Sequence, residues 1–282
     1  MSKIAYQGEP GAFSHQACAE AYPEHEPIGC ATFEEAFAAV EDGGVDLAMI
    51  PVENTVAGRV PDIHHLLPES PLHIVAEYFL PVRFHVLAAP GASLDAITAV
   101  AAHPMGLAQC RRILKARGWA GVRELDNAGA ARLVAQGATP AQAALASELA
   151  GRIHGLEPLM RDVQDDADAT TRFIVLSRTA LNPPRDGGPY VTSFLFRVRN
   201  VPAALYKAMG GFATNGVNMT KLESYQIEGK FTATQFYADV EGHPEDLPLA
   251  RALEELAFFS TRVRIVGVYP QAAYRKARAG QP

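Results

Sequence analysis

Two hydroxyls and a guanidinium stand side by side at residues 170–172, directly before the apolar run Phe-Ile-Val-Leu. Such a run predicts a strand, so Thr170, Thr171 and Arg172 would lie at a strand edge. A threonine hydroxyl can donate a hydrogen bond to a departing oxygen, and an arginine can pair bidentately with a carboxylate. This combination suits an anionic substrate that loses a leaving group. On this segment alone, an ordinary strand entry with an exposed Arg172 is the alternative.

A second polar cluster follows an apolar run at residues 51–60, Pro-Val-Glu-Asn-Thr-Val-Ala-Gly-Arg-Val. Glu53 offers an acid or base, Asn54 both a donor and an acceptor, and Thr55 another hydroxyl. A capped turn in which Thr55 and Gly58 serve the backbone would explain only part of the cluster. At the carboxyl ends of parallel strands, such residues are more typical of a ligand site.

Two further loops are predicted between a strand and a helix. Residues 8–14, Gly-Glu-Pro-Gly-Ala-Phe-Ser, offer close backbone approach and helix N-terminal N–H groups that can hold a carboxylate or phosphate. Their spacing matches neither a P-loop nor a dinucleotide fingerprint, and Ser14 acting only as a helix cap is the simpler interpretation. In residues 103–110, Gln109 is the better candidate for substrate contact, whereas His103 before Pro104 is expected to be a loop residue.

Strands and helices that alternate through the first part of the chain must position these loops. Strands are expected at residues 3–7, 46–51, 99–102, 122–125 and 143–146, and helices at 14–22 and 33–41. This alternation predicts an open, mostly parallel α/β sheet. An extended stretch at 74–89 interrupts it and a strand at 172–177 closes it. Two α/β lobes joined by crossing segments, with a cleft between them, would explain that layout.

A Pro/Gly cluster at residues 182–189 is the best linker candidate, because it can continue neither a helix nor a central strand. After it the patterns run strand 192–199, helix 203–214, strand 217–225, strand 231–241, helix 245–259 and strand 262–269. This order predicts a ferredoxin-like βαββαβ unit. The predicted domains are therefore 1–181 and 190–271, with a C-terminal tail at 272–282 that is expected to be frayed and solvated.

Composition narrows the functional classes. The 282 residues are 48% hydrophobic and 20% charged, which allows about two globular domains. The net charge of −6 argues against a nucleic-acid binder and a polybasic membrane anchor. Because no apolar stretch reaches signal-peptide or transmembrane length, a cytoplasmic location is expected. Cys18, Cys30 and Cys110 are odd in number and unclustered, so neither a disulfide framework nor a metal site is predicted.

The four loops together resemble the successive motifs of prephenate dehydratases, in the same order. The motifs are residues 8–14, residues 51–60, His103-Pro104 with Gln109-Cys110, and Thr171-Arg172-Phe173. The second part, with Val-Pro-Ala-Ala-Leu at 201–205 and Leu-Glu-Ser at 222–224, resembles the phenylalanine-binding ACT domain that follows them. The resemblance covers nearly the full chain. It implies a two-lobed, periplasmic-binding-protein-like α/β catalytic region followed by a ferredoxin-like ACT domain.

The resemblance also implies a cofactor-free lyase reaction, in which prephenate loses its ring hydroxyl and its ring carboxylate to give phenylpyruvate. L-Phenylalanine would be a feedback inhibitor, and the chain would form a homodimer or homotetramer. The implied catalytic residues are Thr171, Glu53, Asn54 and Gln109, and the implied substrate-binding residues are Ser14, Thr55, Thr170, Arg172 and Phe173. The implied phenylalanine-binding residues are Ala203, Ala204, Leu205, Asn218, Glu223 and Ser224.

Some positions depart from the family pattern. Ala169 stands where an Asn is usual and Met105 where a Gln is frequent, while Ala203 and Tyr225-Gln226 replace parts of Gly-Ala-Leu and Glu-Ser-Arg-Pro. A second hypothesis is an arogenate or cyclohexadienyl dehydratase, which would use the same protein site to act on the amino-substituted substrate. A cytoplasmic carboxylate-binding sensor without chemistry is a third hypothesis, against which the combination of Glu53 and Thr171 argues.

Overall fold

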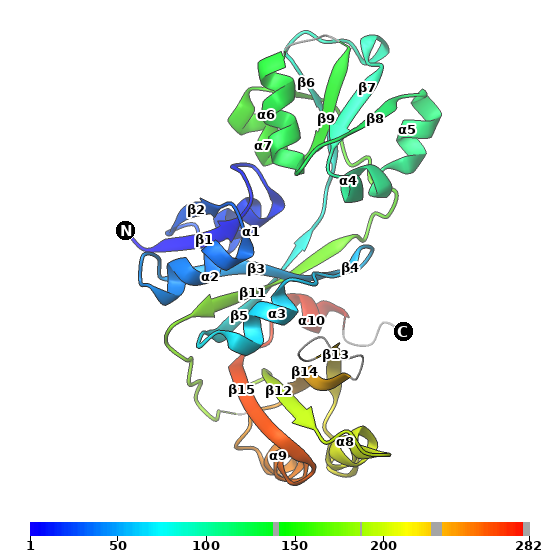
Figure 1. Cartoon of the computed structure of the whole chain (residues 1–282). Helices are drawn as coiled ribbons and strands as arrows, with labels where there is room; N and C mark the ends of the chain where they lie inside the picture. The colour runs from blue at the N-terminus through cyan, green and yellow to red at the C-terminus, as the bar shows by residue number, and fades with distance from the viewer. Residues whose placement is uncertain (138–140, 187, 227–232, 279–282) are drawn as a thin grey trace. The chain divides into compact units, whose positions relative to one another are not determined.

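The computed structural model describes residues 1–137, 141–186, 188–226 and 233–278. Two compact units make up the chain (Figure 1). Met1–Val60 and Tyr78–Phe173 form unit 1, and Pro61–Glu77 and Ile174–Pro282 form unit 2. Unit 1 holds the four predicted chemical loops, and unit 2 holds the predicted phenylalanine-binding residues.

The first lobe of unit 1 is built on parallel strands. Its elements are β1 (Lys3–Gln7), α1 (Phe13–Ala21), β2 (Glu26–Cys30), α2 (Phe33–Glu41), β3 (Leu47–Asn54) and the short β4 (Gly58–Arg59). β1 lies between β2 and β3 and is parallel to both, while β11 (Thr170–Ser177) follows β3 in the strand order. Ile4, Ala5 and Tyr6 in β1 are all buried. A continuous apolar run of this kind is typical of a parallel strand that is covered on both faces.

The second lobe is a five-stranded sheet in the order β10-β6-β9-β7-β8. Its elements are β6 (His85–Ala88), η1 (Leu94–Ala96), β7 (Ala99–Ala102), α4 (Pro104–Gln109), α5 (Arg111–Arg117), β8 (Ala120–Arg123), α6 (Asn127–Gly137), β9 (Gln142–Ala146), α7 (Glu148–His154) and β10 (Glu157–Met160). α6 and α7 lie on one side of this sheet and α4 and α5 on the other (Figure 1). In β9, Ala144 and Ala146 pack with α6 and α7, and Ala143 and Leu145 belong to the opposite core.

The chain enters the second lobe after β5 (His73–Pro81) and leaves it after β10. The predicted pair of α/β lobes joined by two crossing segments is therefore confirmed. The single extended stretch predicted at 74–89 is two strands, β5 and β6, because residues 82–84 between them make the crossing.

Unit 2 contains the predicted ferredoxin-like βαββαβ order. Its elements are β12 (Tyr190–Val198), α8 (Ala204–Thr214), β13 (Met219–Gln226), β14 (Ala233–Glu241), α9 (Leu247–Phe259) and β15 (Ser260–Pro270). The strands are antiparallel in the order β13-β14-β12-β15. Phe194, Phe196 and Phe236 pack with Phe212 of α8 and Leu256 of α9 to form the core of this unit. The residues expected at 231–232 lie outside the described part of the chain.

The segment Pro61–Glu77 belongs to unit 2 although it comes early in the sequence. It carries α3 (Ile63–Glu69) and the beginning of β5. Arg264 of β15 donates hydrogen bonds to the carbonyl oxygens of Leu67 and Ser70. Gly267 pairs with Ile74, and a Cβ on Gly267 would lie 2.4 Å from the Ile74 carbonyl oxygen. Only glycine allows this approach of β15 to β5.

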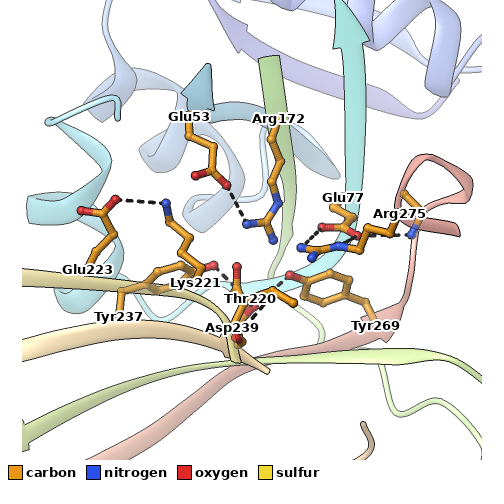
Figure 2. A network of polar contacts seen from close by, with 12 residues as sticks. Glu53, Glu77, Arg172, Thr220, Lys221, Glu223, Tyr237, Asp239, Tyr269 and Arg275 are labelled. Atoms are coloured by element: carbon orange, nitrogen blue, oxygen red, sulfur yellow. Dashed lines mark hydrogen bonds and ion pairs between the residues drawn. The ribbon is translucent and has the colours of Figure 1, made fainter. Parts of the chain in front are cut away.

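The expectation of a frayed tail is wrong for the part of it that the structure describes. Residues Ala273–Arg278 form helix α10. The Arg275 guanidinium donates two hydrogen bonds to the fully buried carboxylate of Glu77, at 2.6 and 2.9 Å, as Figure 2 shows. The Ala272 amide donates a third. A buried carboxylate needs such partners, so Glu77 holds α10 in place.

Within the described residues, none of the helices has the length and apolar character needed to span a lipid bilayer.

Candidate active site

A cavity of about 280 Å³ lies between the two lobes of unit 1. This volume is close to the lower end of the roughly 300–1,000 Å³ typical of small-ligand sites. The loops that follow β1, β3, β7, β8 and β9 all contribute to its wall, as does β11. Its polar lining residues include Gln7, Ser14, Asn54, His103, Gln109, Asp126, Asn127, Ser147 and Thr171. Phe13, Val82, Phe84 and Phe173 supply an apolar wall, with Phe13 and Phe84 in edge-to-face contact.

The alternation of side chains along β11 decides which of its residues reach the cavity. Thr171 and Phe173 line it. Thr170 and Arg172 are buried and lie on the other face of the strand. Ala169, where the family usually has Asn, is buried in the apolar core of the second lobe and brings no polar contact.

Asn54 fixes the Thr171 hydroxyl. The Asn54 side-chain oxygen Oδ1 accepts hydrogen bonds from the amides of Val56 and Ala57. This leaves Nδ2 to donate to Thr171 Oγ1, at 2.9 Å. Because Oγ1 is the acceptor in that bond, the hydroxyl proton of Thr171 can be donated to another group. Thr171 is therefore positioned as a hydrogen-bond donor toward the cavity.

Gln109 carries an unsatisfied polar atom at the cavity wall. Its side chain is 9% exposed, and its Oε1 atom is buried without a hydrogen-bond partner in the described part of the chain. A buried acceptor that lacks a donor is costly, which favours a ligand that supplies one. Cys110 beside it is fully buried, and burial raises the pKa of its thiol to about 12. The thiol is therefore protonated and is no nucleophile.

Four helices begin at the cavity. α1, α4, α6 and α7 start at Phe13, Pro104, Asn127 and Glu148, and residues in or just before the first turn of each line the wall. Helix N-termini present N–H groups and a partial positive charge, which favours bound anions. Among the described lining residues there is no lysine or arginine. Carboxylates in this cavity would therefore be held mainly by N–H groups and neutral side chains.

Ser14 lines the cavity but does not cap α1. The helix begins at Phe13 after Ala12, and Ser14 lies buried within the first turn. The simpler interpretation of Ser14 as a cap is thus wrong. Met105, where the family often has Gln, is part of the lining and about 41% exposed.

Glu53 and Arg172 lie outside the cavity lining and pair with each other. Arg172 Nη1 is 3.0 Å from Glu53 Oε1, and the Arg172 side chain is only 4% exposed (Figure 2). The alternative of an exposed Arg172 is therefore wrong. Thr55 and Thr170 join the turn after β3 to β11: each backbone amide donates to the other residue, Thr170 N to Thr55 Oγ1 and Thr55 N to Thr170 O.

The cavity thus brings together five of the nine predicted site residues: Ser14, Asn54, Gln109, Thr171 and Phe173. The other four, Glu53, Thr55, Thr170 and Arg172, support it from outside the lining. Asp126, Asn127 and Ser147 also line the cavity and were not predicted from the sequence. Each lies between a strand and the first turn of the next helix, the same signal that identified the other loops.

The predicted phenylalanine-binding residues gather in two places in unit 2. Ala203 precedes α8 with a φ of 61°, a left-handed conformation that favours glycine, and Ala204 and Leu205 begin the helix. Asn218 precedes β13 and donates to Glu241, whereas Glu223 and Ser224 lie within that strand. Glu223 pairs with the buried ammonium group of Lys221, at 3.2 Å.

Residues 4–181 match the prephenate dehydratase family. The chain belongs to that family, whose members are lyases. Within the residues that the structure describes, no group of His, Cys, Asp or Glu side chains could hold a metal ion.

Several known proteins resemble the chain over nearly its whole length. A bifunctional N-acyl-homoserine lactone acylase/prephenate dehydratase of Komagataeibacter europaeus is 50% identical over 97% of both chains. Arogenate dehydratase 2 of Petunia hybrida is 38% identical, with 95% of this chain and 71% of the relative covered. The structure of a prephenate dehydratase from Arthrobacter aurescens in complex with L-Phe superimposes with a TM-score of 0.86 at 28% identity, covering 98% of this chain and 97% of the other.

Proposed function

We propose that the chain catalyses the decarboxylative dehydration of prephenate to phenylpyruvate. The observation that carries this proposal is the Thr171 hydroxyl, which Asn54 holds as a donor in a cavity surrounded by helix N-termini. Membership of the prephenate dehydratase family supports it.

The reaction needs two bonds to break at the substrate ring. The C–O bond to the ring hydroxyl releases hydroxide, and the C–C bond to the ring carboxylate releases carbon dioxide while its electrons make the ring aromatic. Because aromatisation supplies the driving force, the protein chiefly orients the dianion and stabilises the departing hydroxide. No cofactor is required for this chemistry.

Thr171 and Gln109 match the two hydrogen-bonding capacities of the ring hydroxyl. Thr171 can donate a hydrogen bond to its oxygen, and the unsatisfied Oε1 of Gln109 can accept a hydrogen bond from its O–H group. The N-termini of α1, α6 and α7 and the neutral side chains beside them would hold the carboxylates. Glu53 and Arg172 act indirectly in this proposal, by fixing β3 against β11 behind the cavity.

The test is direct. The purified full-length chain is incubated with prephenate, and phenylpyruvate is followed by its absorbance in base. We expect turnover without an added metal ion or cofactor. If prephenate is not consumed, the proposal is wrong.

Arogenate dehydration is a second candidate, favoured by a carboxylate in the cavity wall, that of Asp126. Arogenate carries an ammonium group where prephenate carries a keto group, and relatives from Petunia hybrida are named arogenate dehydratases. The release of L-phenylalanine from arogenate measures this activity. An assay of the same preparation with an N-acyl-homoserine lactone measures the acylase activity named for the Komagataeibacter europaeus relative.

We further propose that L-phenylalanine inhibits the enzyme by binding to the ferredoxin-like part of unit 2 as an ACT domain. The L-Phe complex of the Arthrobacter aurescens relative supports this. Val201, Tyr206 and Leu222 are exposed apolar side chains near the predicted binding residues, and β13 ends the strand order, so two copies could pair there to form a homodimer or homotetramer. Calorimetry with L-phenylalanine tests binding. Its absence at millimolar concentration would refute this regulation and leave the dehydratase proposal intact.

A further inference from the structure

Asp126 brings a negative charge to a cavity that has to accept an anionic substrate. It is the only carboxylate among the described lining residues, which include no lysine or arginine. It follows β8 and precedes α6. Its side chain is partly exposed, so its charge acts on whatever occupies the cavity.

Only one of the two carboxylate oxygens of Asp126 accepts a hydrogen bond from helix α6. Oδ1 accepts a 2.6 Å hydrogen bond from the Gly129 amide in the first turn of α6. Within the described residues, no donor lies within hydrogen-bonding distance of Oδ2. Arg132, further along α6, attracts the Asp126 carboxylate through its charge, but it donates its two hydrogen bonds to Glu9, at 2.6 and 2.8 Å. The negative charge of Asp126 is thus not offset by a direct ion pair there.

Capping alone does not require this charge. Asn and Ser accept hydrogen bonds from helix N-terminal amides about as well as Asp does. A neutral cap would also avoid repelling the carboxylates of prephenate. The choice of Asp makes the wall of the cavity unfavourable to a dianion and favourable to a substrate with a positive group.

Resting on the proposed dehydratase activity, we infer that Asp126 is a specificity-determining residue that binds the side-chain ammonium of arogenate, so that the enzyme accepts the aminated substrate. An ammonium group supplies both the charge and the donors that Oδ2 lacks. The keto group of prephenate offers only lone pairs at the same place. Since Asp126 is partly exposed, water can still solvate it when prephenate binds, and discrimination between the two substrates is moderate.

The test is the substitution Asp126→Asn, which removes the charge and keeps an oxygen that can accept from Gly129. We expect the ratio of kcat/KM for arogenate to that for prephenate to fall at least tenfold. The fall should come mainly from a higher KM for arogenate, because the ammonium lies away from the breaking bonds. The value for prephenate should stay the same or rise.

Asp46→Asn is the matched control. Asp46 accepts a hydrogen bond from the Lys3 amide, is exposed and does not line the cavity, so this variant makes the same change in net charge. Its substrate ratio should equal that of the parent chain. Asp126→Ser, which also keeps a capping oxygen, serves if the asparagine variant does not fold.

The outcomes separate the two proposals. If the parent chain consumes neither substrate, the dehydratase proposal is wrong. If it consumes prephenate and not arogenate, or if Asp126→Asn leaves the ratio unchanged, the inference about Asp126 is overturned and Asp126 only caps α6. A tenfold fall in the ratio with an unchanged control supports it.

Discussion

The Thr171 hydroxyl owes its direction to hydrogen bonds made by its neighbour. The amides of Val56 and Ala57 occupy Asn54 Oδ1, so the amide nitrogen must face Thr171. Thr171 therefore accepts from Asn54 and keeps its own proton for donation to a group in the cavity. A flipped Asn54 amide would reverse this, because its oxygen would accept the hydrogen bond that the Thr171 hydroxyl donates.

This arrangement predicts the effect of two substitutions. Thr171→Val should lower kcat for prephenate at least about a hundredfold with a smaller change in KM, the scale expected for the loss of a transition-state donor. Asn54→Asp should lower kcat to a similar extent, since its carboxylate would accept the Thr171 proton while still serving Val56 and Ala57. Thr98→Val, an exposed site away from the lining, is the control. Near-normal turnover by the valine variant would eliminate Thr171 as the donor.

Arg172 gives a different prediction at the same scale. Because it pairs with Glu53 outside the lining, Arg172→Lys should leave the KM for prephenate within about twofold. Lysine cannot reproduce the planar guanidinium, so the buried position should cost stability, about 1–3 kcal/mol. Substrate kinetics and urea unfolding separate the two effects. A large rise in KM with unchanged stability would show instead that Arg172 binds substrate.

At the scale of elements, the strand signals in the sequence predicted most of unit 1. The runs at 3–7 and 99–102 match β1 and β7. β2 was missed because Glu-Pro-Ile-Gly-Cys contains a proline and a glycine, which weaken a strand pattern, and its place beside β1 comes from tertiary pairing. The strand predicted at 122–125 is observed at Ala120–Arg123, where Gly121 concealed its start.

Some positions of the site residues could be predicted from the sequence, and others could not. Period-two alternation along β11 separates Thr171 and Phe173 from Arg172, and this signal was present in the sequence. The partnership of Glu53 with Arg172 joins residues 119 positions apart, so no local pattern could reveal it. The cavity contributions of Asp126 and Ser147 likewise depend on how the two lobes meet.

The loop between β1 and α1 makes a close contact that permits only glycine. Gly11 has a φ of 98°, and an added Cβ would lie 2.6 Å from Ala150 Cα in α7. We therefore expect Gly11→Ala to push the loop away from the second lobe and to lower kcat/KM for prephenate at least tenfold. Gly118→Ala is the control, because Gly118 also has a positive φ but no atom within 4 Å of the new Cβ. Equal kinetics for the two variants would contradict the importance of this contact.

At the scale of the whole catalytic unit, an ion pair joins the two lobes. Glu9 of the first lobe pairs with Arg132 of α6, and this hydrogen-bonded partner lowers the pKa of the Glu9 carboxyl. Ser147 Oγ adds a buried hydrogen bond to the Gly11 carbonyl oxygen. The contacts between the lobes are therefore partly electrostatic, and they depend on pH.

Because the Glu9 pKa is lowered, the contribution of the pair is complete above the ordinary pKa of glutamate, about 4.3, and is lost as the pH falls through the lowered value. We expect Glu9→Gln to raise the KM for prephenate about two- to fivefold at pH 7, since the pair is partly exposed. The KM of the parent chain should approach that of the variant in acid. Glu148→Gln, which breaks an ion pair within one lobe, should not have this effect. A constant KM ratio at every pH would contradict the mechanism.

Contacts within unit 2 determine whether a truncated chain can fold. Truncation after Pro183 would remove the predicted ACT domain and tests whether the rest of the chain folds on its own. The truncated chain, however, would lose Arg264, Gly267 and Arg275, the partners of segment 61–77. We expect it to be aggregated or cleaved by protease within that segment, because Ile63, Leu67, Leu72 and Ile74 are buried in the full chain. A soluble, protease-resistant product would show that residues 1–183 fold independently.

The pairing of Glu77 with Arg275 also has a consequence for protein synthesis. The two residues are 198 positions apart, and a ribosome adding roughly 5–20 residues per second needs about 10–40 s to make that stretch. During this interval Glu77 and the apolar side chains of α3 have emerged before their partners exist. Residues 61–77 must therefore wait for these partners with their apolar side chains uncovered, which makes this segment a candidate site for chaperone binding during synthesis.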